Sequence, residues 1–136
     1  MGRSLRPEYL AFFEARMIEH TCVERWEPLD NAVEYLYLIE RKRGLPDVRV
    51  HLSDAYEYSR GEYLARPEEV AGGNVFVVLG DPHASGPSAA LVAEARKDRV
   101  GIGHIGKFMG ALTSRNVWEY EAPEERENGR PTLRRR

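Results

Sequence analysis

The sequence predicts an α/β domain with a small, mostly parallel sheet of three to four strands flanked by helices. Residues 75–79 (VFVVL) form an uninterrupted apolar run, which is typical of a strand covered on both faces. A glycine-rich turn, an alanine-rich stretch with helical apolar spacing and a second short apolar strand at 100–104 follow. Because strand-helix-strand units of this length form right-handed parallel crossovers, we expect residues 74–112 to form the centre of the sheet.

Length and composition indicate a single globular domain. The chain has 136 residues, of which 42% are hydrophobic and 31% charged, and its net charge of -2 provides no overall attraction to nucleic acid or acidic membranes. Cys22 is the only cysteine, so an internal disulfide is excluded. The sequence shows no signal-like start and no apolar window of membrane-spanning length, and we therefore expect a cytoplasmic protein without a membrane partner.

Apolar periodicity and chain breakers predict the remaining elements. Residues 1–121 are expected to form the domain, and residues 122–136, which lack apolar content, a polar and disordered tail. The expected elements are a helix from residue 7 to about residue 20, a connector over 22–27, a strand over 48–52, a short helix over 61–65, helices opening near 88 and 107, and an edge strand over 116–120.

Residues 28–44 (PLDNAVEYLYLIERKRG) allow two interpretations. As a helix, the segment has a proline in its first turn, basic residues in its last turn and Gly44 directly after it. As a strand, its tyrosines and aliphatic residues alternate and suit a sheet. The agreement of the start and stop patterns favours the helix.

Polar residues that follow the predicted strands form the first candidate site. Carboxyl ends of parallel strands meet at one edge of a sheet, where ligands bind in such folds. Imidazole and carboxylate groups at this edge suit a divalent metal, with Asp81, His83 and His104 as its ligands, and serines before a helix suit a phosphate. Turn stabilisation and helix capping explain the same residue types without a ligand. The complete predicted ligand-binding set is Asp54, Asp81, His83, Ser85, Ser88, His104 and Lys107.

Residues 28–30 (Pro-Leu-Asp), followed by residues 40–42 (Glu-Arg-Lys), form the second candidate site. This arrangement resembles the motif of the PD-(D/E)XK nuclease superfamily, the restriction-endonuclease-like proteins. The resemblance implies that Asp30 and Glu40 hold a divalent metal, Mg²⁺ or Mn²⁺, and that Lys42 is the third catalytic residue, in a metal-assisted phosphodiester hydrolysis.

The second half of the chain adds to this resemblance. In Mrr-like members of the superfamily, the catalytic strands precede a strand, a serine-initiated alanine-rich helix, a short strand and a terminal helix, and residues 74–112 look similar in that order. The resemblance covers about residues 28–112. It requires a strand at residues 33–42, because the motif residues lie on strands in that superfamily.

Three functional hypotheses follow. The leading one is a nucleic-acid-processing or nucleic-acid-associated protein of nuclease-like fold, either active as a metal-dependent phosphodiesterase or catalytically degenerate. The alternative is a non-nuclease α/β module that binds a phosphate-containing small ligand or a metal at the carboxyl ends of its strands. The third is an interaction subunit without chemistry, in which a tyrosine-rich loop and the first helix form a homo-oligomer interface.

Overall fold

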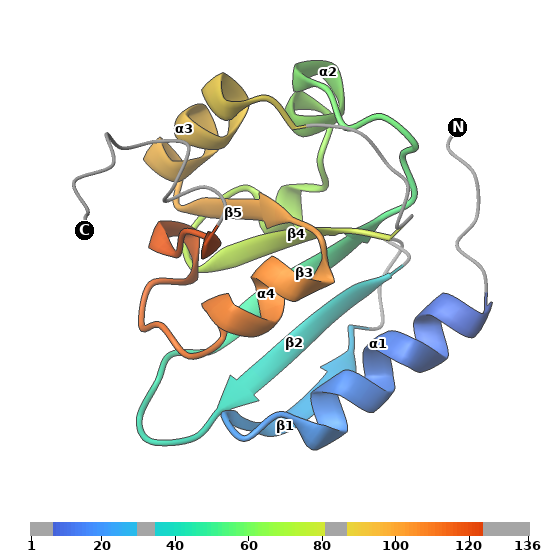
Figure 1. Ribbon diagram of the computed structural model, residues 1–136, viewed down its shortest axis with the longest axis vertical. Helices are drawn as coiled ribbons and strands as arrows, with labels where there is room; N and C mark the ends of the chain where they lie inside the picture. Colours follow the sequence, from blue (N-terminus) through green and yellow to red (C-terminus); the bar gives the residue numbers. More distant parts are fainter. Residues whose placement is uncertain (1–6, 30–34, 81–86, 124–136) are drawn as a thin grey trace, which may run out of the picture.

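The computed structural model describes residues 7–29, 35–80 and 87–123, and a five-stranded sheet runs through them (Figure 1). Its strand order is β1-β2-β3-β4-β5; β2 is antiparallel to both β1 and β3, and β3, β4 and β5 are parallel. The α/β class is therefore confirmed, but the prediction of a mostly parallel sheet of three to four strands is wrong. The strands are β1 (Val23–Pro28), β2 (Leu36–Arg41), β3 (Val48–Ser53), β4 (Val75–Leu79) and β5 (Val100–Gly103).

The parallel half of the sheet agrees with the sequence prediction. All side chains of β4 are buried, as expected for a strand with helices over both faces. In β3 the alternation is visible in the structure, because Val48, Val50 and Leu52 are fully buried and Arg49 is exposed. Strands β3, β4 and β5 end at the same edge of the sheet, which we call the carboxyl edge; β2 begins there.

The helix predicted over residues 28–44 and the connector predicted over 22–27 are both wrong. Residues 23–28 and 36–41 are strands that pair with each other, Trp26 opposite Ile39. The alternation of Tyr37 and Ile39 into one buried cluster decided the structure of β2, since burial against α1 outweighs the local helix start and stop patterns. The basic residues before Gly44 belong to a turn, in which Arg43 and Gly44 have φ values of 63° and 71°.

Helices cover both faces of the sheet (Figure 1). α1 (Pro7–Glu19) and α4 (Ile105–Ala111) pack on one face, and α2 (Arg60–Leu64) and α3 (Ala89–Lys97) lie on the other with the short 3-10 helix η1 (Glu68–Val70). The helices α1, α2, α3 and α4 lie close to the predicted positions, whereas η1 was not predicted. The edge strand predicted over 116–120 is wrong, because this segment forms the 3-10 helix η2 (Val117–Glu119). No helix within the described ranges is both long and apolar enough to cross a membrane.

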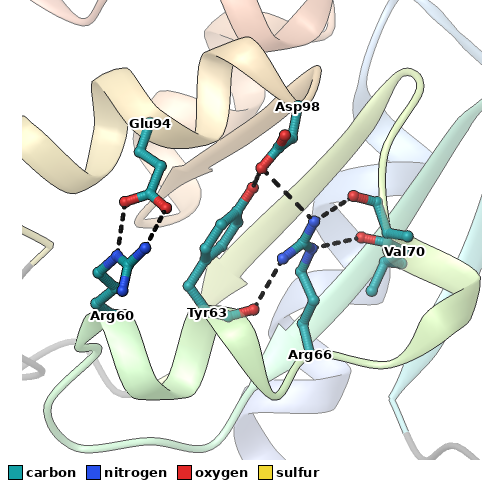
Figure 2. A network of polar contacts seen from close by, with 7 residues as sticks. Arg60, Tyr63, Arg66, Val70, Glu94 and Asp98 are labelled. Atoms are coloured by element: carbon teal, nitrogen blue, oxygen red, sulfur yellow. Dashed lines mark hydrogen bonds and ion pairs between the residues drawn. The ribbon is translucent and has the colours of Figure 1, made fainter.

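Polar contacts fasten α2 to α3 (Figure 2). The Arg60 guanidinium donates two hydrogen bonds to Glu94, at 2.9 and 3.1 Å. The Tyr63 hydroxyl donates to Asp98 at 2.5 Å, and Arg66 donates to the Tyr63 and Val70 carbonyls at 2.9 and 3.0 Å. Burial first, and then this hydrogen bond, raises the pKa of Tyr63. These contacts therefore connect α2, η1 and α3 into one layer on this face of the sheet.

Candidate functional site

The structure brings only part of the predicted carboxyl-edge set together. Asp54 follows β3 and His104 follows β5, so with β4 between them their backbones lie about 10 Å apart. Asp81, His83 and Ser85 lie outside the described residues. The Ser88 hydroxyl caps α3 by accepting a hydrogen bond from the Leu91 amide at 3.1 Å. The described ranges contain no group of three histidine, cysteine or acidic side chains placed to hold a metal ion.

Of the nuclease-like set, Glu40 and Lys42 can be located, whereas Asp30 lies outside the described residues. Glu40 is on β2, and Lys42 follows that strand with an exposed side chain. The Glu40 carboxylate accepts a hydrogen bond from Arg25 on β1 at 2.7 Å. This one carboxylate, already held by a guanidinium, does not by itself fit a divalent metal.

A pocket of about 410 Å³ lies at the carboxyl end of β5. It contains two of the predicted ligand-binding residues, His104 and Lys107, which stand at the start of α4. A Cβ atom on Gly103 would lie 2.6 Å from Lys107 Cδ, so the absence of a side chain there lets the lysine stem pack against the end of the strand. The remaining lining residues come from three segments and are Pro87, Val92, Ile102, Gly103, Gly106, Tyr120, Ala122 and Pro123.

Basic side chains gather at the opposite edge of the sheet, where β2 ends and β3, β4 and β5 begin. In Figure 1 this edge includes the lower left, around the arrowhead of β2. The sequence analysis proposed Lys42 as catalytic and recognised residues 41–43 as a basic run that could contact phosphates, but it did not connect this run with Arg99 or Arg115. We define the basic edge as the buried Arg41 and the exposed Lys42, Arg43, Arg99 and Arg115.

Arg41 organises this edge. Its guanidinium donates to the carbonyl of Pro46 at 2.7 Å and, at the end of α4, to the carbonyls of Leu112, Ser114 and Arg115 at 2.9, 2.5 and 2.9 Å. Arg41 is 6% exposed and forms no ion pair with a described residue. Burial, assisted by the charge of Arg115, lowers the pKa of Arg41. Backbone carbonyl oxygens of the β2–β3 turn and of the segment that follows α4 therefore hold a buried positive charge.

Asn74 connects the rest of the edge. Its side-chain amide donates to the Asp47 carbonyl at 2.7 Å, and its side-chain oxygen accepts from the Val117 amide at 3.4 Å. The Val75 amide, one residue further on, donates to the Arg99 carbonyl at 3.4 Å. These bonds hold the start of β3, the start of β5 and the chain after α4 together, so Arg99 and Arg115 are both placed at the edge where β2 ends.

The exposed members of the basic edge are not neutralised by nearby carboxylates. Lys42, Arg43, Arg99 and Arg115 form no ion pair within the part of the chain that the structure describes. The acidic residues nearby along the chain are Glu40, Asp47, Asp98 and Glu119. Of these, Glu40 pairs with Arg25, Asp98 accepts from Tyr63 (Figure 2) and Glu119 accepts from Asn116 at 3.2 Å. A local positive charge therefore stands out in a chain of net charge -2.

No family model, curated protein or solved structure matches this chain. Its function is therefore argued from the two edges of the sheet.

Proposed function

We propose that this protein is a nucleic-acid-associated protein that binds the sugar-phosphate backbone at its basic edge. The observation that carries the proposal is the buried Arg41, which holds the loop of Arg115 in place beside exposed cations that have no described ionic partner. The hydrogen bonds of Arg41 and Asn74 fix the backbone from which these cations extend, so binding needs to order their side chains only.

The residue types at the edge suit phosphate. Arg43, Arg99 and Arg115 present planar guanidinium groups, which match phosphate oxygens in a bidentate manner. Between the end of β2 and the start of β5 lie three strand spacings, about 14 Å, and a DNA duplex presents roughly eight phosphates over such a length. Contacts of this kind position a nucleic acid without reading its sequence, so we expect little sequence preference.

Nuclease activity is a second candidate, and one observation favours it. That function needs a strand at residues 33–42, and β2 covers residues 36–41, so Glu40 lies on the strand and Lys42 directly follows it. A metal-dependent enzyme would hold Mg²⁺ or Mn²⁺ at Glu40 together with Asp30. The hydrogen bond from Arg25 to Glu40 supports the catalytically degenerate form instead, and we propose binding without cleavage.

Binding of labelled single-stranded DNA, duplex DNA and RNA over a series of salt concentrations tests the proposal. We expect the affinity to fall as salt rises, because binding releases counterions. The double variant Arg43→Gln/Arg115→Gln should reduce the magnitude of the slope of log K against log salt by about 2, roughly one for each lost phosphate contact. It should weaken binding to all sequences alike.

The matched control is Arg16→Gln/Arg60→Gln, which removes the same charge from exposed side chains on α1 and α2. Equal loss of affinity in both variants would show a nonspecific charge effect and would contradict the proposal, as would an absence of binding at low salt. Incubation of the same nucleic acids with Mg²⁺ or Mn²⁺ is run in parallel. Cleavage that disappears in Glu40→Ala would establish the nuclease candidate and overturn the degenerate one.

A further inference from the structure

Strand β1 has a paired side and an open side. β2 pairs with it on one side, and no described strand pairs with it on the other, so β1 ends the sheet (Figure 1). Its residues Glu24, Arg25, Glu27 and Pro28 are exposed. An unpaired strand presents backbone donors and acceptors to any chain that can pair with them. We propose that the open side of β1 pairs with β1 of a second copy of this chain.

The pairing of β1 with β2 determines which backbone groups reach the open side. The Leu29 amide donates to the Leu36 carbonyl at 2.8 Å, so these two residues form a hydrogen-bonded pair of the antiparallel ladder. Because such pairs alternate along the ladder, Trp26 lies in a non-hydrogen-bonded pair with β2, and its N–H and C=O point away from β2. Pro28 also faces outward but has no N–H. Over residues 25–28, Trp26 is therefore the one residue that both donates and accepts on the open side.

This arrangement selects a symmetric pairing centred on Trp26. Two antiparallel copies of β1 related by a two-fold axis place Trp26 opposite Trp26 of the partner subunit, and each N–H then donates to the other's C=O. The same register places Arg25 opposite Glu27 of the partner subunit, once on each side of the axis. Opposite charges directly across a pair of strands attract each other, and paired aromatic rings pack. A second copy therefore matches this strand in backbone bonding and in charge.

Features that protect β1 from aggregation limit this pairing to a short stretch. The strand has an irregularity in its register between Val23 and Arg25, and Pro28 ends it. These features leave no long run of free backbone groups for a foreign strand or for a stack of copies. A closed pair around one axis needs only the short stretch that remains.

Helix α1 is available to extend the contact. It lies beside β1 at the end of the sheet (Figure 1), and a two-fold axis normal to the sheet places both α1 helices on the same face of the pair. It carries the exposed apolar side chains of Phe12 and Ile18, which are 41% and 72% exposed. A strand pair of this length buries less than the about 800 Å² per partner of a standard interface, so we expect a dissociation constant of about 10 µM or more.

Sedimentation velocity of the full chain over roughly 5 to 500 µM tests the inference, and we expect a monomer–dimer equilibrium without larger species. Glu27→Arg places arginine opposite arginine and Arg25→Glu places glutamate opposite glutamate, so each variant alone should lose about tenfold in dimer affinity. An equimolar mixture of the two variants places arginine opposite glutamate at both positions and should restore the dimer. The control Glu62→Arg makes the same charge change on α2 and should dimerise as the unmodified chain does.

Hydrogen exchange at low and high protein concentration adds a readout for single residues. The Trp26 amide should be slowed only at high concentration, whereas the Glu27 amide, which points to β2, should be protected at both. A chain that stays monomeric throughout, a Trp26 amide already protected in the monomer, a dimer that both single variants retain unweakened, or a mixture that stays monomeric would overturn the inference.

The dimer and the basic edge can be tested separately. The basic edge lies at the ends of the strands, whereas the pairing uses the open side of β1, so neither covers the other. Arg43→Gln/Arg115→Gln should therefore dimerise as the unmodified chain does, whatever its effect on nucleic acid. Failure of the dimer would leave nucleic-acid binding standing, and the reverse holds as well.

Discussion

The buried charge of Arg41 holds together the chain segments that form the basic edge. Burying a guanidinium is costly unless its donors find acceptors, and here carbonyls from the β2–β3 turn and from the end of α4 supply them. A lysine could not reach the same set, because it lacks the planar fork of donors. The position between Glu40 and Lys42, which the nuclease-like motif leaves unspecified, is therefore the structurally demanding one.

The first prediction concerns the stability that Arg41 provides. Replacing it with methionine keeps apolar volume but leaves the carbonyls of Pro46, Leu112, Ser114 and Arg115 without their donor. We expect unfolding free energy to drop by about 3 kcal/mol, and the midpoint of thermal unfolding by roughly 10 °C. Urea and thermal unfolding measure both. Lys42→Met, on an exposed neighbour, should change stability by less than about 0.5 kcal/mol, and an equal effect of the two would refute this role.

At the scale of elements, the hairpin of β1 and β2 is where sequence reasoning failed. Taken alone, Pro28 and the basic residues before Gly44 are typical of the start and end of a helix. In the structure, Pro28 ends β1 and the basic residues lie at the end of β2 and in the turn after it. The stabilising contacts of β2 come from Phe13 on α1, which is remote in the sequence, and from pairing with its neighbours β1 and β3, none of which a window over residues 28–44 contains in full. Local patterns sufficed for β4, because a strand buried on both faces is apolar at every position.

Attachment of α2 to α3 gives a prediction at the same scale. A five-residue helix is too short to be stable alone, so its order depends on tertiary contacts such as the Tyr63 hydroxyl bond to Asp98 (Figure 2). Tyr63→Phe keeps the buried ring and removes the bond, and we expect a loss of about 1 to 2 kcal/mol.

Hydrogen exchange of α2 amides distinguishes a local from a global role for this bond. Faster exchange in α2 with unchanged protection in β4 would show that the bond stabilises α2 alone. Uniformly faster exchange would show that the bond supports the whole fold. Arg60→Gln removes an exposed ion pair with Glu94 that solvent screens, so it should change stability less than Tyr63→Phe does.

At the scale of the whole molecule, the sheet places the carboxyl edge and the basic edge at opposite ends of its parallel strands. Sequence reasoning anticipated the carboxyl edge, because parallel strand ends are predictable from order alone, and it placed His104 and Lys107 there. It missed the basic edge, since Arg99 and Arg115 are remote from residues 41–43 in sequence and meet them only through Asn74 and Arg41. No charge run in the sequence marks that meeting.

Alkaline pH should destabilise the whole molecule through its buried tyrosines. Burial raises the pKa of Tyr9 to about 12, and burial followed by the charge of Glu14 raises that of Tyr37 to about 12, against 10.0 unperturbed. Below pH 10 both phenols are protonated in the folded and unfolded chains. The full stability that comes from burying the protonated phenols is therefore present there. Between pH 10 and 12 the unfolded chain ionises first and stability falls, by roughly 2 kcal/mol per tyrosine.

Urea unfolding at successive pH values, followed together with tyrosinate absorbance, measures this loss. Tyr37→Phe should cost about 1 kcal/mol at neutral pH, since it removes the 3.2 Å bond to Glu14, and should then make the alkaline fall shallower. A fall equally steep in this variant would show that Tyr37 does not contribute. Tyrosinate absorbance that rises while the chain is still folded would show that the phenols ionise without unfolding, and the alkaline loss would then need another source.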